Sequence, residues 1–118
     1  MPISRLTECI VATQQDLACR SIPTPILGHV GDGNFHCLFL IDPGNEAQLL
    51  EARRLNARLV ARALSMEGTC TGEHGVGLGK QDYLKQELGE AVDVMREIKR
   101  LFDPHNILNP GKLVPPID

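Results

Sequence analysis

The sequence lacks the features that mark several large classes of protein. Its net charge is only −3, so there is no basic excess to attract nucleic acid or an anionic membrane surface. No apolar run approaches the roughly 20 residues that a transmembrane helix needs. The chain also starts without the basic segment and apolar stretch of a secretory signal peptide, which predicts a cytoplasmic location.

The sequence also lacks one cysteine motif and one glycine motif. The four cysteines are scattered and form no Cys-x-x-Cys pair, so we expect free thiols, with Cys37 as a small apolar core residue. The phosphate-loop pattern fails around Gly79 and Lys80, because His74 stands at its first glycine position and Gln81 at its last. Nucleotide binding through these glycines is therefore not expected.

What is present fits one soluble globular domain of 118 residues, with 42% apolar and 23% charged residues. Helical periodicity and turn residues predict helices, in chain order, over residues 4–20, 45–66, 80–88 and 90–102. Between the first two helices we expect a hairpin with strands at 25–31 and 34–42. The predicted fold class is α+β: an antiparallel sheet with helices packed on one side and a C-terminal helical segment.

Local signals refine these elements. Ser4 and Asn45 are the expected N-caps of the first two helices, and Gln48 completes a capping box with Asn45. Gly68 suits a left-handed C-cap. The hairpin carries large apolar residues on both faces, so we expect both to be covered. The last helix shows an apolar stripe comprising Ala91, Val94, Met95, Ile98, Leu101 and Phe102.

The hairpin carries the first candidate site. A two-residue turn at Asp32 and Gly33 would place His29 directly opposite His36 on one face. Two imidazoles that converge in this way can bind a divalent metal such as zinc. Either histidine alone would more often be a core residue with satisfied hydrogen bonds, but the pair on one face favours a metal site.

The second candidate site is Glu73 and His74, which lie in a segment with five glycines between residues 68 and 79. Glycines let the backbone approach a ligand or adopt positive φ. A carboxylate beside a histidine can supply a metal ligand and a general base. The alternative is a flexible surface loop with two ordinary polar residues.

The remaining polar residues have simpler interpretations. Asp32 is interpreted as a turn residue, while Asn34, between the two histidines, is either a turn residue or a contact to a bound oxyacid. Four arginines along the second helix are interpreted as a solvated face rather than an anion site: Arg53, Arg54, Arg58 and Arg62.

Three motifs in order give the chain a family resemblance: residues 28–36 (GHVGDGNFH), 72–77 (GEHGVG), and the pair 98–104 (IKRLFDP) and 109–112 (NPGK). Together they resemble the C-terminal cap domain of FAD-linked D-2-hydroxy acid dehydrogenases, in the vanillyl-alcohol-oxidase flavoprotein superfamily. Cytochrome-type D-lactate dehydrogenase and the FAD subunit of glycolate oxidase belong to this group. The resemblance covers nearly the whole chain.

The resemblance implies a function for each motif. His29, His36 and Glu73 would bind a divalent metal, usually zinc, and His74 would take the hydroxyl proton of a small 2-hydroxy acid while hydride passes to FAD. Asn34 would contact the substrate, and Asn109 would contact the cofactor.

The resemblance also implies what residues 1–118 would lack. They would form a partial ferredoxin-like cap domain without the flavin-binding domain, which would be a separate partner. We expect the isolated chain to be inert and to form a homodimer through exposed apolar surface. The alternatives are a free-standing metal-binding module without redox activity and, as the weakest, a metal-assisted hydrolase.

Overall fold

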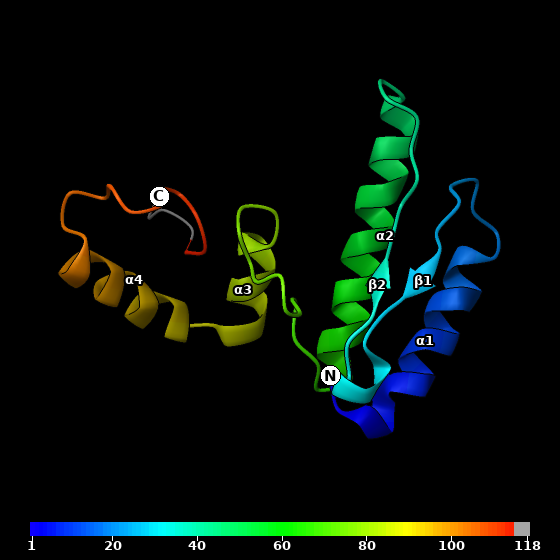
Figure 1. The fold of residues 1–118 in the computed structure, drawn as a ribbon, viewed down its shortest axis with the longest axis horizontal. Helices are drawn as coiled ribbons and strands as arrows, with labels where there is room; N and C mark the ends of the chain where they lie inside the picture. The colour runs from blue at the N-terminus through cyan, green and yellow to red at the C-terminus, as the bar shows by residue number, and fades with distance from the viewer. Residues whose placement is uncertain (115–118) are drawn as a thin grey trace. The chain divides into compact units, whose positions relative to one another are not determined.

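The computed structural model describes residues 1–114 and divides into two units, each described here by itself. The first unit, Met1–Thr69, contains α1 (Ile3–Leu17), β1 (Ile26–Leu27), the short 3₁₀ helix η1 (Val30–Asp32), β2 (His36–Cys37) and α2 (Glu46–Ser65), as Figure 1 shows. The second unit, which begins at Cys70, contains α3 (Gln81–Leu88) and α4 (Ala91–Phe102). The predicted mixture of helices with a small antiparallel sheet is confirmed. None of the helices in residues 1–114 is long and apolar enough to cross a membrane.

The helix ends follow the sequence signals only in part. The Asn45 side chain accepts a hydrogen bond of 3.1 Å from the Gln48 backbone N–H, as the capping box predicts. Pro2, rather than Ser4, precedes the first turn of α1, and no side chain caps it. The left-handed residue after α2 is Glu67, with φ 59°, not Gly68. Gly68 serves a close approach instead, because a Cβ there would lie 2.7 Å from the Ala63 carbonyl oxygen.

The hairpin is present, but its regular strands have only two residues each. The paired residues are Ile26 with Cys37 and Leu27 with His36. Two further hydrogen bonds of 3.0 Å extend the pairing, from Leu38 N–H to the Pro25 carbonyl and from Leu40 N–H to the Pro23 carbonyl. Proline has no N–H to return these bonds, so the ladder is one-sided there. This explains why the strands are shorter than the predicted ranges.

The predicted turn and register are wrong by two residues. The chain turns through η1 and Gly33 (φ 71°), and the Asn34 N–H donates to the His29 carbonyl at 3.3 Å. His29 therefore lies opposite Asn34, and His36 faces Leu27. Side chains alternate between faces with a period of two, so a shift of two residues keeps His29 on the same face as His36. The two histidines are diagonal rather than direct neighbours.

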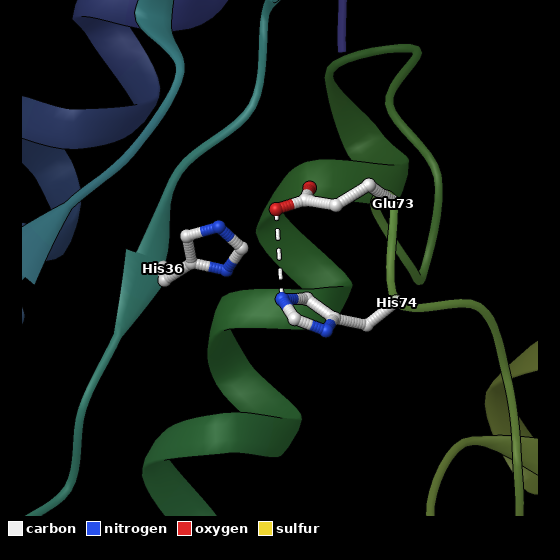
Figure 2. Close-up of side chains that lie close together, drawn as sticks. All are labelled: His36, Glu73 and His74. Carbon is white, nitrogen blue, oxygen red and sulfur yellow. Dashed lines mark ion pairs between the residues drawn. The ribbon is translucent and has the colours of Figure 1, made fainter.

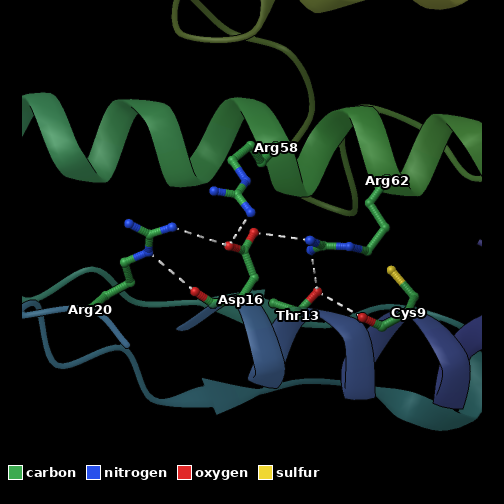
Figure 3. A network of polar contacts seen from close by, with 6 residues as sticks. All are labelled: Cys9, Thr13, Asp16, Arg20, Arg58 and Arg62. Carbon is green, nitrogen blue, oxygen red and sulfur yellow. Dashed lines mark hydrogen bonds and ion pairs between the residues drawn. The ribbon is translucent and has the colours of Figure 1, made fainter. Parts of the chain in front are cut away.

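A charged cluster joins α1 to α2 in the first unit (Figure 3). The Asp16 side chain is only 6% exposed and lies 2.9 Å from Arg62 and 2.5 Å from Arg58. Arg62 also donates to the Thr13 hydroxyl, which in turn donates to the Cys9 carbonyl. The prediction of a solvated arginine face is thus wrong for Arg62, whose side chain is 17% exposed.

The apolar core is small in both units. In the first it comprises Leu6, Cys9, Ile22, Ala52, Leu55 and Val60, and in the second Cys70, Val76, Leu84 and Val92. Contrary to expectation, Leu27, Leu38 and Leu40 of the hairpin region are about half exposed, at 51%, 47% and 55%. The predicted stripe of α4 is also exposed, with Phe102 at 78%. A periodic pattern identifies an apolar face but does not show that the same chain covers it.

The Asp16 cluster makes a first prediction about stability. Asp16→Ala leaves Arg62 partly buried without its carboxylate, so the free energy of unfolding should fall by about 2 kcal/mol or more. Glu8→Gln, which removes only the exposed ion pair with Arg5, should change it by about 0.5 kcal/mol or less. Urea unfolding followed by circular dichroism measures both. Equal effects would show that the Asp16 cluster contributes little.

The hairpin makes a second prediction, with two glycines as a matched pair. A Cβ at Gly28 would lie 2.4 Å from the Phe35 Cα, whereas a Cβ at Gly31 meets nothing within 4 Å. Gly28→Ala should therefore disrupt the hairpin beside His29, while Gly31→Ala should be tolerated. Amide chemical shifts of residues 26–37 report the difference. A hairpin that accepts alanine at both positions would contradict this account.

Candidate metal and catalytic site

The hairpin brings His29 and His36 together. Their ring centroids are 6.4 Å apart and the ring planes are perpendicular. His29 is exposed at the start of the turn, and His36 is half-buried on β2, from which it extends in Figure 2. Each ring has nitrogens that can bind a metal in the neutral state. The predicted face-sharing of the two imidazoles is present, although the predicted register is not.

The glycine loop brings Glu73 and His74 together. They occupy the two central positions of a tight turn, which the Gly75 N–H closes by donating to the Gly72 carbonyl at 3.1 Å. Gly75 has φ 74°, a conformation that favours glycine. Glu73 Oε1 lies 3.5 Å from His74 Nε2, drawn as the dashed line in Figure 2. Both side chains are open to solvent, His74 at 78% and Glu73 at 45%.

Asn34 and Asp32 lie in the hairpin turn. Asp32 is the last residue of η1 and its N–H donates to the His29 carbonyl at 2.9 Å, in keeping with a turn role. Asn34 is half-buried, and its backbone lies opposite His29 in the turn. An amide in this position can donate to and accept from a bound oxyacid.

Asn109 lies in the segment after α4, which Asp103 organises. The Asp103 carboxylate is buried and accepts from the backbone N–H groups of Ile107 and Leu108, each at 2.9 Å. It also accepts from Lys99, which lowers the pKa of Asp103 to about 2 and keeps it ionised above that pH. Asn109 has φ 49° and accepts from Lys112 through both its carbonyl and its side chain.

Two of the cysteines, Cys37 and Cys70, are not activated as nucleophiles. All four thiols are free, as predicted. Burial is the main cause that raises the pKa of Cys37 and of Cys70 to about 11, so both stay protonated at neutral pH.

Sequence reasoning missed three residues whose hydrogen bonds lie in the segments that carry Glu73, His74 and Asn109 or precede them. The Thr71 hydroxyl donates to the Gly75 carbonyl at 2.5 Å and ties the glycine turn together. Gln81 donates to the Gly111 carbonyl at 2.6 Å. Asp103 organises the segment before Asn109. Only Asp103 carried a local signal, since a helix ends at the residue before a proline.

The predicted site residues thus form two pairs, and each pair is complete within one unit. His29 and His36 belong to the first unit, and Glu73 and His74 to the second. Asn34 accompanies the first pair, and Asn109 lies in the same unit as the second.

Comparison with known proteins places the chain in a family. Residues 1–113 match the family model described as FAD linked oxidases, C-terminal domain. The chain is 51% identical over 117 residues to the mitochondrial D-lactate dehydrogenase [cytochrome] of Arabidopsis thaliana, covering 98% of this chain and 21% of that protein. It is 50% identical over 115 residues to the "Probable D-lactate dehydrogenase, mitochondrial" of Danio rerio, covering 97% and 23%.

A bacterial relative extends the comparison. The glycolate oxidase subunit GlcD of Bacillus subtilis is 38% identical over 114 residues, covering 96% of this chain and 24% of that protein. The chain therefore spans less than a quarter of the length of these relatives. The match of the family model over residues 1–113 and these identities show that the chain belongs to the C-terminal domain family of FAD-linked oxidases.

Proposed function

We propose that this chain is the substrate- and metal-binding part of an FAD-dependent D-2-hydroxy acid dehydrogenase acting on a D-lactate-like substrate. The observation that supports this most directly is the presence of both polar pairs, His29 with His36 and Glu73 with His74, in a member of the FAD-linked oxidase family. The whole of residues 1–118 would act as the cap over the substrate, a partial ferredoxin-like domain.

The donor set fits a divalent metal, and zinc in particular. Imidazole nitrogens bind zinc at about 2.0–2.1 Å and carboxylate oxygens at about 2.0–2.2 Å. Ring centroids 6.4 Å apart let one nitrogen of each histidine reach a shared ion after the side chains rotate. Glu73 would complete the set with Oε2, because Oε1 is the oxygen nearest His74. Three protein ligands leave a fourth position for the substrate.

His74 is the proposed general base. Its Nε2 would accept the proton of the substrate hydroxyl, and the Glu73 carboxylate 3.5 Å away would stabilise the imidazolium that forms. The metal, when bound, would favour the alkoxide as a Lewis acid, and FAD, when bound, would accept the hydride. Asn34 would orient the substrate carboxylate through its side-chain amide.

The proposal divides the flavin and substrate roles between partners. Asn109 is the proposed cofactor contact of this chain, and a flavin-binding domain or subunit would hold most of the FAD. Exposed apolar side chains such as Phe102 on α4 and Leu27 on β1 support a partner surface on each unit. By itself the chain would be inert and would form a homodimer through these surfaces.

The names of the relatives bear on the cellular compartment of this chain. Two of the relatives reported above carry "mitochondrial" in their names, so the cytoplasmic location stays a prediction for this chain.

One alternative has its own support. Every proposed metal ligand belongs to this chain. A metal-binding module without redox activity would use the same residues. The two functions differ in whether His74 matters once a flavin-binding partner is present.

Metal content tests the proposed site directly. The purified chain should bind about one zinc per molecule, and His36→Ala should lower the zinc affinity at least 10-fold because it removes one of three ligands. His105→Ala, an exposed histidine of the same chain, is the matched control and should leave zinc binding unchanged. Elemental analysis and competition with a chelating dye measure stoichiometry and affinity. Zinc binding that survives His36→Ala would rule out this ligand set.

A chimera tests the redox function. These residues should replace the matching 117-residue region of the Arabidopsis thaliana relative with retention of D-lactate oxidation. In the chimera His74→Gln should lower kcat about 10²- to 10⁴-fold, the range for loss of a general base, while His105→Gln should not. The isolated chain with added FAD and an electron acceptor should show no turnover. A His74→Gln chimera with full activity would favour the metal-binding module.

A further inference from the structure

We propose that residues 103–113, here called the C-terminal strap, position the turn that carries Glu73 and His74, and that Gln81 and Asp103 are the positioning residues. All the contacts that support this lie within the second unit. The inference rests on the proposed function for its consequence, because the strap matters to the reaction only if Glu73 and His74 belong to the site.

The first end of the strap is fixed to α4. Asp103 accepts the backbone N–H groups of Ile107 and Leu108, and Lys99 donates to both the Asp103 carboxylate and the Leu108 carbonyl. A buried, ionised carboxylate with three donors holds the chain that leaves the helix in one conformation. Asn109 follows directly after this anchored segment.

The second end of the strap is fixed to the glycine loop. Leu113 N–H donates to the Gly77 carbonyl at 2.8 Å, and Gln81 at the start of α3 donates to the Gly111 carbonyl at 2.6 Å. Gly77 is only three residues beyond His74. The strap therefore crosses back from the end of α4 to the segment that follows the catalytic turn.

The turn is largely open to solvent. Glu73, His74, Gly75 and Gly77 are all exposed, and Val76 is the only one of residues 72–79 that is buried. Thr71 ties the near side of the turn to the Gly75 carbonyl, and the strap ties the far side at Gly77. An exposed, glycine-rich loop would otherwise sample many conformations, at an entropic cost whenever it had to bind. The strap reduces that entropic cost. It also keeps Asn109 at a fixed position relative to the turn.

The test separates positioning from stability. Gln81→Leu removes the donor to the strap but keeps an apolar stem, and Gln86→Leu on the exposed side of the same helix is the matched control. Gln81→Lys keeps a long donor and should restore the wild-type behaviour. In Gln81→Leu the amide exchange of Leu113 and Gly75 should become about 3- to 10-fold faster, as expected for the loss of one hydrogen bond. Zinc affinity should weaken by a similar factor while the thermal unfolding midpoint stays close to that of Gln86→Leu.

The outcomes distinguish this inference from the proposed function. Exchange and zinc affinity in Gln81→Leu that match those of Gln86→Leu would overturn the positioning role. If the wild-type chain binds no zinc, the proposed metal site is wrong. The positioning role of the strap is then tested by amide exchange alone: faster exchange at Gly75 in Gln81→Leu supports it, and unchanged exchange overturns it. Should Gln81→Leu not fold, Lys99→Met loosens the first end of the strap by removing the donor to the Asp103 carboxylate and the Leu108 carbonyl, and unchanged exchange at Gly75 would then overturn the inference.

Discussion

The pairing of Asp16 with Arg58 and Arg62 is the interaction on which the first unit depends most (Figure 3). It joins α1 to α2 where the apolar core is thin, and it extends through the Thr13 hydroxyl to the backbone of α1. A charged cluster of this kind stabilises one arrangement of the two helices, because sliding them would leave a buried carboxylate without its partners. The hairpin with His29 and His36 belongs to the same unit.

The sequence predicted the elements better than their surroundings. Helices α2, α3 and α4 begin within one residue of the predicted positions, because periodicity and the Asn45 cap are local properties. The hairpin register was wrong, because the Asp32–Gly33 pair fits a two-residue turn as well as the longer turn that forms. The strands are short because Pro23 and Pro25 have no N–H groups to donate. The two prolines can be read from the sequence, but the sequence does not show that their effect outweighs the apolar pattern.

The candidate site was predictable in halves. The His29 and His36 rings lie together because the error in register was an even number of residues, and Glu73 and His74 are adjacent in sequence. The supporting contacts of Thr71 and Gln81 were not predictable, since a threonine or glutamine forms such bonds only when a distant carbonyl is brought to it. The exposure of the α4 stripe was also not predictable, because a periodic pattern carries no information about what covers a helix face.

The tight turn at Gly72–Gly75 has a consequence for how the proposed site responds to motion. Glu73 and His74 occupy its two corners, so the proposed metal ligand and the proposed base are carried by a single four-residue body. A displacement of the whole turn therefore moves both residues together, while the side-chain rotamers still set the distance between their polar atoms. The proposed metal ligand and the proposed base would therefore join or leave the rest of the proposed site together.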